Sequence, residues 1–451
     1  MHKRWLPFVA VTSLFFMWGF ITVLVDGLIP RLKAVFELTY LQAGLVQFAW
    51  FAAYGVISIP GGRMIERVGY QRGILVGLAL AAAGCLLFYP AAGTRIYVLF
   101  LLALFVVASG ITVLQVAANP YIAVLGDPAR ASSRLNLAQA FNSLGTTIAP
   151  VVAAGFLLSD TILSAHEQSD LGSVARDSYR AAEAAAVQFP FVWLAGAFGL
   201  LAVCMAAVKL PRILGRDRSR EAGQTSRSRY AFVLANKRLL LGAVGIFLYV
   251  GAEVALGSYM VNYGVSLGVG ELFAQTPWLQ HLAGIAASIT GGEVAQMDVK
   301  GLIGTLLTFY WGGAMIGRFA GSALMRRLAP ARILATFATA AVLLIGLSIA
   351  SSGATALMAL IAVGLCNSIM FPTLFTLAIE ELGDHKPEGS GILCTAIVGG
   401  AFIPPAVGGL TDAFGFGIAF LLPALCYVYI AYYARRVGAE NIKPNAGEVI
   451  I

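Results

Sequence analysis

Apolar residues follow one another along the chain in long segments that are separated by short polar connections. An α-helix needs about 20 mostly apolar residues to cross a hydrocarbon layer of roughly 30 Å. The pattern predicts twelve membrane-spanning helices, near residues 8–30, 41–62, 73–92, 96–125, 133–158, 188–209, 239–266, 301–322, 333–351, 354–380, 390–410 and 414–434. We expect short surface helices in the two longest connections, residues 159–187 and 267–300.

Composition supports this interpretation of the pattern. Of the 451 residues, 59% are hydrophobic and only 12% are charged, and the mean hydropathy is +0.83. An ordinary soluble protein is about 25% charged. The sequence therefore predicts an all-α membrane protein that contacts lipid along most of its length.

The formal net charge of +8 reflects the topology of the chain. With both termini in the cytoplasm, all but six of the 30 lysines and arginines fall in cytoplasmic segments, and this asymmetry is the positive-inside rule. The distribution predicts a multi-pass protein of the cell inner (plasma) membrane with both termini cytoplasmic. It gives no indication of a nucleic-acid partner.

The most polar interruption divides the chain into two related halves. It reads RILGRDRSREAGQTSRSR and lies between the sixth and seventh predicted spans. Matching segments occur in the same order on both sides of it, namely GGRMIERVGYQR with GSALMRRLAPAR and GTTIAP with GAFIPP. Such internal repeats predict two pseudo-symmetric six-helix bundles, residues 1–210 and 238–451, joined by a basic cytoplasmic linker, residues 211–237.

Residues suited to enzyme or metal chemistry are scattered. The five cysteines lack paired metal-ligand spacing and indicate inert packing. The histidines all lie in termini or loops, at His2, His166, His281 and His385. We therefore expect no catalytic residue, no metal site and no cofactor, and a membrane-embedded enzyme is disfavoured.

Two acidic residues lie in the interior of predicted spans, away from their ends. Asp26 is the only charged residue between Arg4 and Arg31, and Glu253 lies midway along the seventh span. A charge at the bilayer centre is disfavoured by about 2.5 to 3.5 kcal/mol, so such a group usually faces a bundle interior or a water-filled cavity. We predict that both carboxylates couple transport to a proton or to Na+. For Asp26 the alternatives are a solvated position near the outer surface or a hydrogen bond to a neighbouring helix. For Glu253 the alternative is a structural hydrogen bond across the helix bundle.

Neutral amides alternate with aromatic rings on the same helical faces. Amides donate to and accept from hydroxyl groups, and aromatic faces pack on the C–H faces of a sugar ring. Because we assign Arg318 to a cytoplasmic connection, no lysine or arginine lies deep in a span, which argues against an anionic solute. The predicted substrate-binding residues are Gln47, Trp50, Gln115, Asn119, Asn136, Gln139, Asn142, Asn262, Trp311 and Asn367. Helix-to-helix bonding by these amides is the alternative.

Charges at the cytoplasmic ends of the second and eighth spans suggest a mechanical role. Ion pairs there would hold the halves in one conformation and break in the other. The predicted conformational latch consists of Glu66, Arg67, Arg72, Arg327 and Arg332. Plain topology-setting charge is the competing explanation.

Several of these segments resemble one family. VDGLIP, LQVAANPYIAVLGD, RLNLAQAFNSLG and YVGAEVALGSYMVNY are similar to segments of the fucose, galactose and glucose cation symporters of the major facilitator superfamily. The resemblance implies twelve helices in two bundles, alternating access and cation-driven sugar uptake. Asp26 and Asn142 match an acid and a sugar-proximal asparagine of the fucose type. The fucose type has a second acid in the fourth span, and this sequence has Gln115 at that position. Glu253 stands where the fucose type has glutamine. This pattern resembles the glucose and galactose branch of the family.

These inferences predict a secondary active transporter that imports a neutral hexose, most simply glucose or galactose, with a proton or Na+. A fucose or N-acetylglucosamine symporter, a uniporter, a drug exporter and a sugar sensor that moves nothing are the alternatives. The expected partners are the sugar and membrane lipid. The expected assembly is a monomer.

Overall fold

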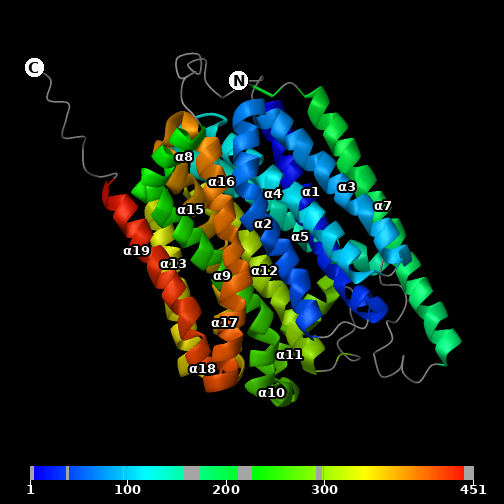
Figure 1. The fold of residues 1–451 in the computed structure, drawn as a ribbon. Helices are drawn as coiled ribbons and strands as arrows, with labels where there is room; N and C mark the ends of the chain where they lie inside the picture. Colours follow the sequence, from blue (N-terminus) through cyan, green and yellow to red (C-terminus); the bar gives the residue numbers. More distant parts are fainter. Residues whose placement is uncertain are drawn as a thin grey trace, which may run out of the picture. The chain divides into compact units, whose positions relative to one another are not determined.

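The computed structural model describes residues 5–36, 40–94, 96–156, 172–208, 210–211, 226–290, 297 and 299–440. Every regular element in these ranges is helical (Figure 1). Ten segments of the described chain are long and apolar enough to cross a membrane. One of them, Gly353–Phe414, contains the tenth and eleventh predicted spans, and a separate helix occupies the place of the fifth.

The first half of the chain forms long helices. They are α1 (Trp5–Phe36), α2 (Tyr40–Val68), α3 (Tyr70–Thr94), α4 (Tyr97–Val124), α5 (Ala131–Phe156) and α7 (Ser173–Ala207). Gly69 separates α2 from α3 with φ of 86°, a left-handed conformation that glycine adopts without the penalty of a Cβ. A single residue therefore suffices to reverse the chain direction.

The second half begins with the short helix α8 (Ser226–Ala235), inside the predicted linker. The helices that follow it are α9 (Lys237–Ser266), α10 (Val269–Gln275), α11 (Pro277–Thr290), α12 (Val299–Leu324), α13 (Pro330–Ala350), α14 (Gly353–Asn367), α15 (Met370–Ile379), α16 (Lys386–Thr395), α17 (Gly399–Phe414), α18 (Phe416–Ala419) and α19 (Leu421–Glu440). The 3-10 segment η5 (Glu380–His385) connects α15 to α16.

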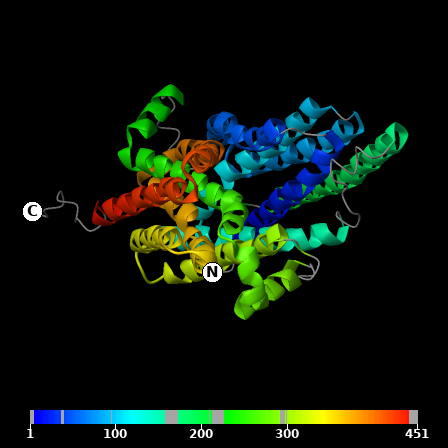
Figure 2. The same cartoon turned by 90° about the horizontal axis from the view of Figure 1, so that it is seen from below.

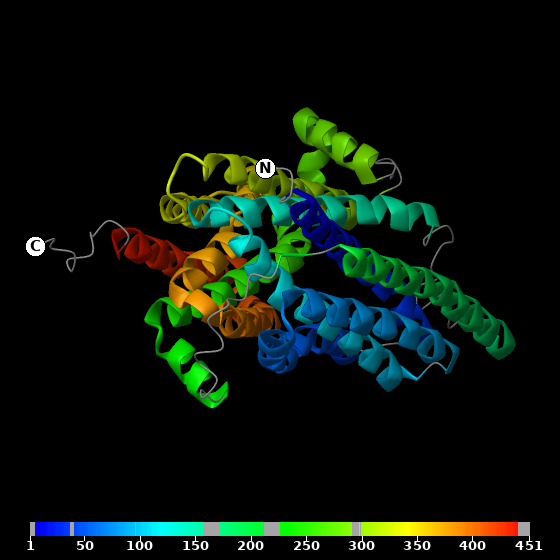
Figure 3. The same cartoon turned by 90° about the horizontal axis from the view of Figure 1, so that it is seen from above.

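The long connections agree in part with expectation. The connection of residues 267–300 contains two short helices, α10 and α11, as predicted. Both pack on α12 (Figure 3). The sixth span differs, because α7 begins at Ser173 and not near residue 188. The added turns are rich in alanine, the strongest helix former, so the helix continues beyond its apolar segment. Residues 157–171 lie outside the described chain.

The chain divides into two compact units. Unit 1 comprises Met1–Leu125, Phe141–Gly223 and Ser390–Thr395; unit 2 comprises Gly126–Ala140, Gln224–Gly389 and Ala396–Ile451. The first residues of α5 thus pack within unit 2, and the last residues of α16 pack within unit 1.

Within unit 1, α3 contacts α4 and α7, and α2 also packs on α4 (Figure 2). Small residues allow the closest approaches. Gly19 of α1 faces the backbone of Asn142, and Gly145 of α5 faces the carbonyl of Phe16. A methyl group at either glycine would overlap the facing backbone. These two glycines therefore bring α1 and α5 into backbone contact.

Unit 2 repeats this arrangement with its own residues. Gly399 of α17 faces the carbonyl of Phe247, and Gly251 of α9 faces Ile403. Helix α9 occupies the place of α1 in the second repeat, and the α16 and α17 pair occupies the place of α5. A glycine-mediated contact between two helices therefore occurs in each unit.

Candidate functional site

A hydrogen-bond network surrounds Glu253 on α9 in unit 2. The hydroxyl of Tyr249, one turn earlier, donates to Glu253 Oε1 at 2.7 Å. Tyr310 of α12 donates its hydroxyl to the Glu253 carbonyl oxygen at 3.3 Å. Both tyrosines are fully buried, so the phenol groups that bond to Glu253 are shielded from bulk water.

Asn367, the last residue of α14, joins three tyrosines of this network. Its Nδ2 donates to the Tyr310 hydroxyl at 2.7 Å, and its Oδ1 accepts from Tyr427 of α19 at 2.6 Å. Its carbonyl oxygen accepts from Tyr249 at 3.1 Å. Asn367 has no exposed surface, and both ends of its amide are bonded. The predicted residues Glu253 and Asn367 therefore belong to one polar cluster drawn from four helices.

Arg318 adds a positive charge to this cluster and corrects the sequence-based assignment. We expected it in the connection after the eighth span, but it lies inside α12 and is half-buried. Its guanidinium is within electrostatic range of Glu253. A half-buried charge is tolerated here because Nε donates to the Ser368 carbonyl at 3.0 Å and Nη1 to the Gln139 carbonyl at 3.4 Å.

Two interior prolines explain why polar groups reach these helices. A proline lacks an N–H, so the carbonyl four residues earlier loses its helical partner. Pro372 frees the carbonyl of Ser368, which Arg318 satisfies. Pro120 in α4 likewise frees the carbonyl of Val116, and the Ser390 hydroxyl of α16 donates to it at 2.9 Å. Each of these carbonyl groups is therefore met by a side chain from another helix.

A second cluster of neutral groups lies in unit 1. Gln115 of α4 donates Nε2 to the Tyr54 hydroxyl of α2 at 2.6 Å, and both side chains are buried. Asn119, one turn further along α4, has no exposed surface. Neither polar atom of its amide has a hydrogen-bond partner among the described residues. Asn119 therefore has unused hydrogen-bonding capacity.

Asn142 belongs to the contact between α1 and α5. Its Nδ2 donates to the carbonyl of Phe15 at 2.8 Å. Asp26 lies two turns beyond Gly19 along α1. The side chain of Asp26 is outside the part of the structure that is described, so its predicted coupling role stays a prediction.

The remaining predicted binding residues are distributed between packed and open positions. Asn136 of α5 donates to Thr373 Oγ1 at 3.2 Å and is fully buried within unit 2. The rings of Trp311 and Tyr310 meet edge to face, with centroids 5.0 Å apart, while 46% of Trp311 stays exposed. Gln47 and Asn262 are exposed and Trp50 is half-buried.

The predicted latch residues do not pair with one another in the described chain. Glu66 is buried, whereas the four arginines of the set are exposed and form no ion pair within 4 Å among the described residues. The ion pairs of buried Arg238 at the start of α9 are with Glu380 and Glu381. The sequence analysis did not single out this cluster, and the latch stays a prediction.

Comparison with known proteins decides the family. A profile described as Major Facilitator Superfamily matches residues 8–397. The chain belongs to this superfamily. A "Glucose/galactose transporter" of Brucella abortus biovar 1 (strain 9-941) is 47% identical over 96% of this chain and 94% of its own. An "L-fucose-proton symporter" of Escherichia coli (strain K12) is 36% identical over 95% and 92%.

Solved structures of facilitator proteins have the same fold. The crystal structure of the transporter FucP in the outward conformation is 32% identical, covers 96% of this chain and 98% of its own, and has a TM-score of 0.83. The proton:xylose symporter XylE, with 12% identity and a TM-score of 0.59, shares the fold alone. The predicted helical facilitator fold is therefore confirmed, and so is its assignment to transporters and not to enzymes.

Tyr310, Tyr427 and Arg318 belong to the polar cluster around Glu253, and the sequence did not single them out. The two tyrosines lie in otherwise apolar segments, where a phenol alone does not distinguish packing from function. Arg318 had a usable signal, since it lies inside the stretch predicted as the eighth span. Arg326 and Arg327 follow closely, and a group of arginines at the end of a span is typical of a cytoplasmic connection.

Proposed function

We propose that this chain imports a neutral hexose, glucose or galactose, together with a proton, by alternating access. The observation that carries the proposal is the presence of one carboxylate, Glu253, among buried neutral phenols and amides on membrane-spanning helices. A carboxylate that can take up a proton suits cation coupling, and neutral groups suit an uncharged polyol. The names of the relatives agree with both parts of the proposal.

Gln115 and Asn119 are the first candidates for sugar contact. The Nε2 of Gln115 is used by Tyr54, which orients its carbonyl oxygen as an acceptor. Asn119 retains both a donor and an acceptor. A buried amide without partners is unfavourable by itself, so a hydroxylated ligand that bonds to it gains the free energy of satisfying both groups. Asn142, Gln139 and Trp50 are further candidates from the predicted set.

Asp26 and Glu253 are the proposed coupling carboxylates. When a carboxylate is deprotonated it carries a charge that must be compensated, and when it takes up a proton that requirement disappears. Arg318 provides the compensation for Glu253. Proton uptake therefore changes what Arg318 and Tyr249 bind, which links the protonation state to the arrangement of α9, α12 and α14.

The proposed topology places the chain in the cell inner (plasma) membrane with both termini in the cytoplasm. The two bundles, residues 1–210 and 238–451, flank the basic linker, and one chain forms the transport unit. Reporter fusions at the C-terminus and within residues 212–225 test the orientation. Activity of a reporter that works only outside the cell, at either position, contradicts it.

Uptake by purified protein in liposomes tests the function directly. Labelled glucose, galactose, fucose and N-acetylglucosamine are offered with an inward proton gradient, an inward sodium gradient or neither. We expect glucose and galactose to accumulate only with the proton gradient. Accumulation driven by sodium alone overturns proton coupling. If sugar binds without counterflow of label, the chain is a sensor and transport is overturned.

A further inference from the structure

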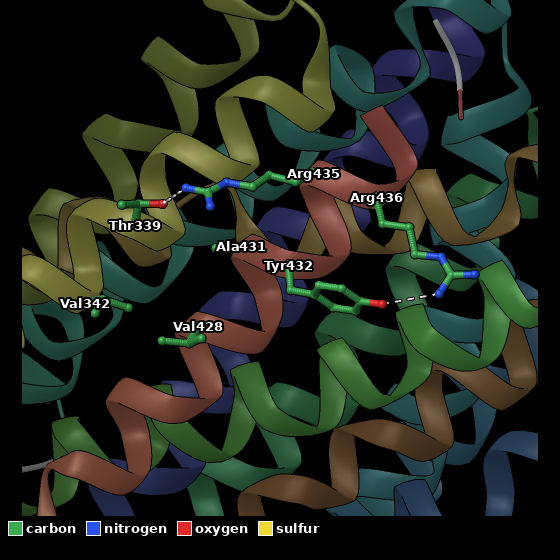
Figure 4. A pocket seen from close by; sticks show the side chains of 7 residues that line it. All are labelled: Thr339, Val342, Val428, Ala431, Tyr432, Arg435 and Arg436. Atoms are coloured by element: carbon green, nitrogen blue, oxygen red, sulfur yellow. Dashed lines mark hydrogen bonds between the residues drawn. The ribbon is translucent and has the colours of Figure 1, made fainter. Parts of the chain in front are cut away.

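A groove of about 530 Å³ lies on the surface of unit 2, where α13 and α19 pack side by side (Figure 4). Val342 of α13 and Val428 of α19 form its apolar part. Arg435 and Arg436 line its other end (Figure 4). The groove therefore has an apolar floor and a basic end.

The position of the arginines along α19 sets the depth of the basic end. The apolar stretch of α18 and α19 ends at Arg435, after about 20 residues, which is the length that crosses the hydrocarbon layer. Arg435 and Arg436 therefore fall at the level of lipid headgroups. Val428, two turns earlier, falls at the level of the acyl chains and is 48% exposed.

The basic end carries more positive than negative charge. Arg436 pairs with Glu440 at 3.3 Å. It also donates Nη1 to the Tyr432 hydroxyl at 3.3 Å (Figure 4). Arg435 donates Nη2 to Thr339 Oγ1 at 3.4 Å (Figure 4). Among the described residues, no carboxylate lies within 4 Å of Arg435. One guanidinium is therefore held in place by a neutral partner and keeps its charge uncompensated.

We propose that this groove binds one anionic phospholipid, with its phosphate at Arg435 and Arg436 and an acyl chain along Val342 and Val428. Guanidinium groups recognise phosphate oxygens through paired hydrogen bonds. Basic pockets between membrane-spanning helices are suited to acidic lipid headgroups. The charge and the apolar floor are complementary to the two ends of such a lipid. The inference rests on unit 2 alone and is independent of the transported solute.

Lipid retention by the full-length protein tests the proposal. The purified protein is exchanged into mixed phosphatidylglycerol and phosphatidylcholine, washed, and examined by native mass spectrometry. We expect one phosphatidylglycerol to be retained by the wild type. Arg435→Gln with Arg436→Gln, and separately Val428→Trp, should each reduce its retention at least tenfold. The Trp variant leaves all charges in place and only fills the groove.

The matched control is Lys237→Gln with Arg326→Gln, which removes two exposed cations that do not line the groove. It should retain phosphatidylglycerol like the wild type. Equal loss in the control, or equal retention of the two lipids by the wild type, overturns the proposal. A photoreactive phosphatidylglycerol gives a test without any substitution. It should label peptides of α13 and α19, and labelling confined to other helices also overturns the proposal.

Discussion

The Tyr249 hydroxyl donates a hydrogen bond of 2.7 Å to Glu253 Oε1, one turn apart on α9. The same hydroxyl lies 3.1 Å from the Asn367 carbonyl at the end of α14. Tyr249 therefore connects the proposed coupling carboxylate to the point where the tenth span is interrupted. A change in the charge of Glu253 alters the preferred partner of one buried phenol, and through it the contact between two helices.

Replacement of Tyr249 by Phe tests this connection. The ring and its packing stay, while the hydrogen bond to the carboxylate is lost. Hydrogen bonds to charged groups contribute about 1.5–3 kcal/mol, and 1.4 kcal/mol corresponds to about a tenfold change in an equilibrium constant. We expect proton-driven sugar accumulation to fall about tenfold, with counterflow largely retained. If the two activities decline together, Tyr249 has only a structural role.

Glu253→Gln should separate coupling from binding. The amide keeps the shape and can still accept from Tyr249, but it cannot take up a proton. We expect accumulation against a gradient to disappear while sugar counterflow persists, and Asp26→Asn should behave in the same way. Asp412→Asn is the matched control, because Asp412 is exposed on α17 and lies outside the network. Full accumulation by Glu253→Gln would remove this residue from the coupling step.

Arg318→Gln should destabilise the protein through the charge of Glu253. Loss of a charged donor to the Ser368 carbonyl, and of the positive charge near the carboxylate, should cost about 1–3 kcal/mol. A double-mutant cycle with Glu253→Gln measures the coupling between the two groups by thermal unfolding. We expect the second substitution to restore part of the lost stability. Strictly additive effects would show that the two charges do not interact.

The sequence predicted the helical fold because long apolar segments have few alternatives in a membrane. It also singled out the half-buried acid Glu253 and the buried amide Asn367, since polar groups stand out in apolar segments. It did not predict which groups meet. Helical spacing places residues on a face, but the hydrogen bond of Tyr427 to Asn367 depends on how α14 and α19 pack.

The prolines also show that the sequence predicts a polar group but not its partner. Pro120 and Pro372 indicate that carbonyl groups are released, and the chemistry of proline suffices for that inference. The partners Ser390 and Arg318 come from residues distant in sequence. Arg318 was misplaced because charge near a span end predicts topology on average and says nothing of one side chain's hydrogen bonds.

Substitution of Asn367 by Ala tests whether its amide stabilises the tyrosine network. It would leave the hydroxyls of Tyr310 and Tyr427 buried without their amide partner. Each unsatisfied buried polar group costs about 1–3 kcal/mol, so the apparent melting temperature should fall by several degrees. Asn262→Ala is the control, because Asn262 is exposed and such changes stay within about 0.5 kcal/mol. Equal melting temperatures of the two variants would show that the Asn367 amide does not stabilise the network.

Gln115→Ala tests the sugar-binding assignment in unit 1. Removal of the amide takes away the hydrogen bond to Tyr54 and one proposed sugar contact, so the apparent affinity for the hexose should fall about tenfold. Tyr54→Phe removes the same internal bond but leaves the amide of Gln115 in place. We therefore expect a smaller loss of affinity in Tyr54→Phe than in Gln115→Ala, measured by competition uptake. Equal losses would assign the effect to the internal bond, and an unchanged affinity in Gln115→Ala would exclude this residue from the sugar site.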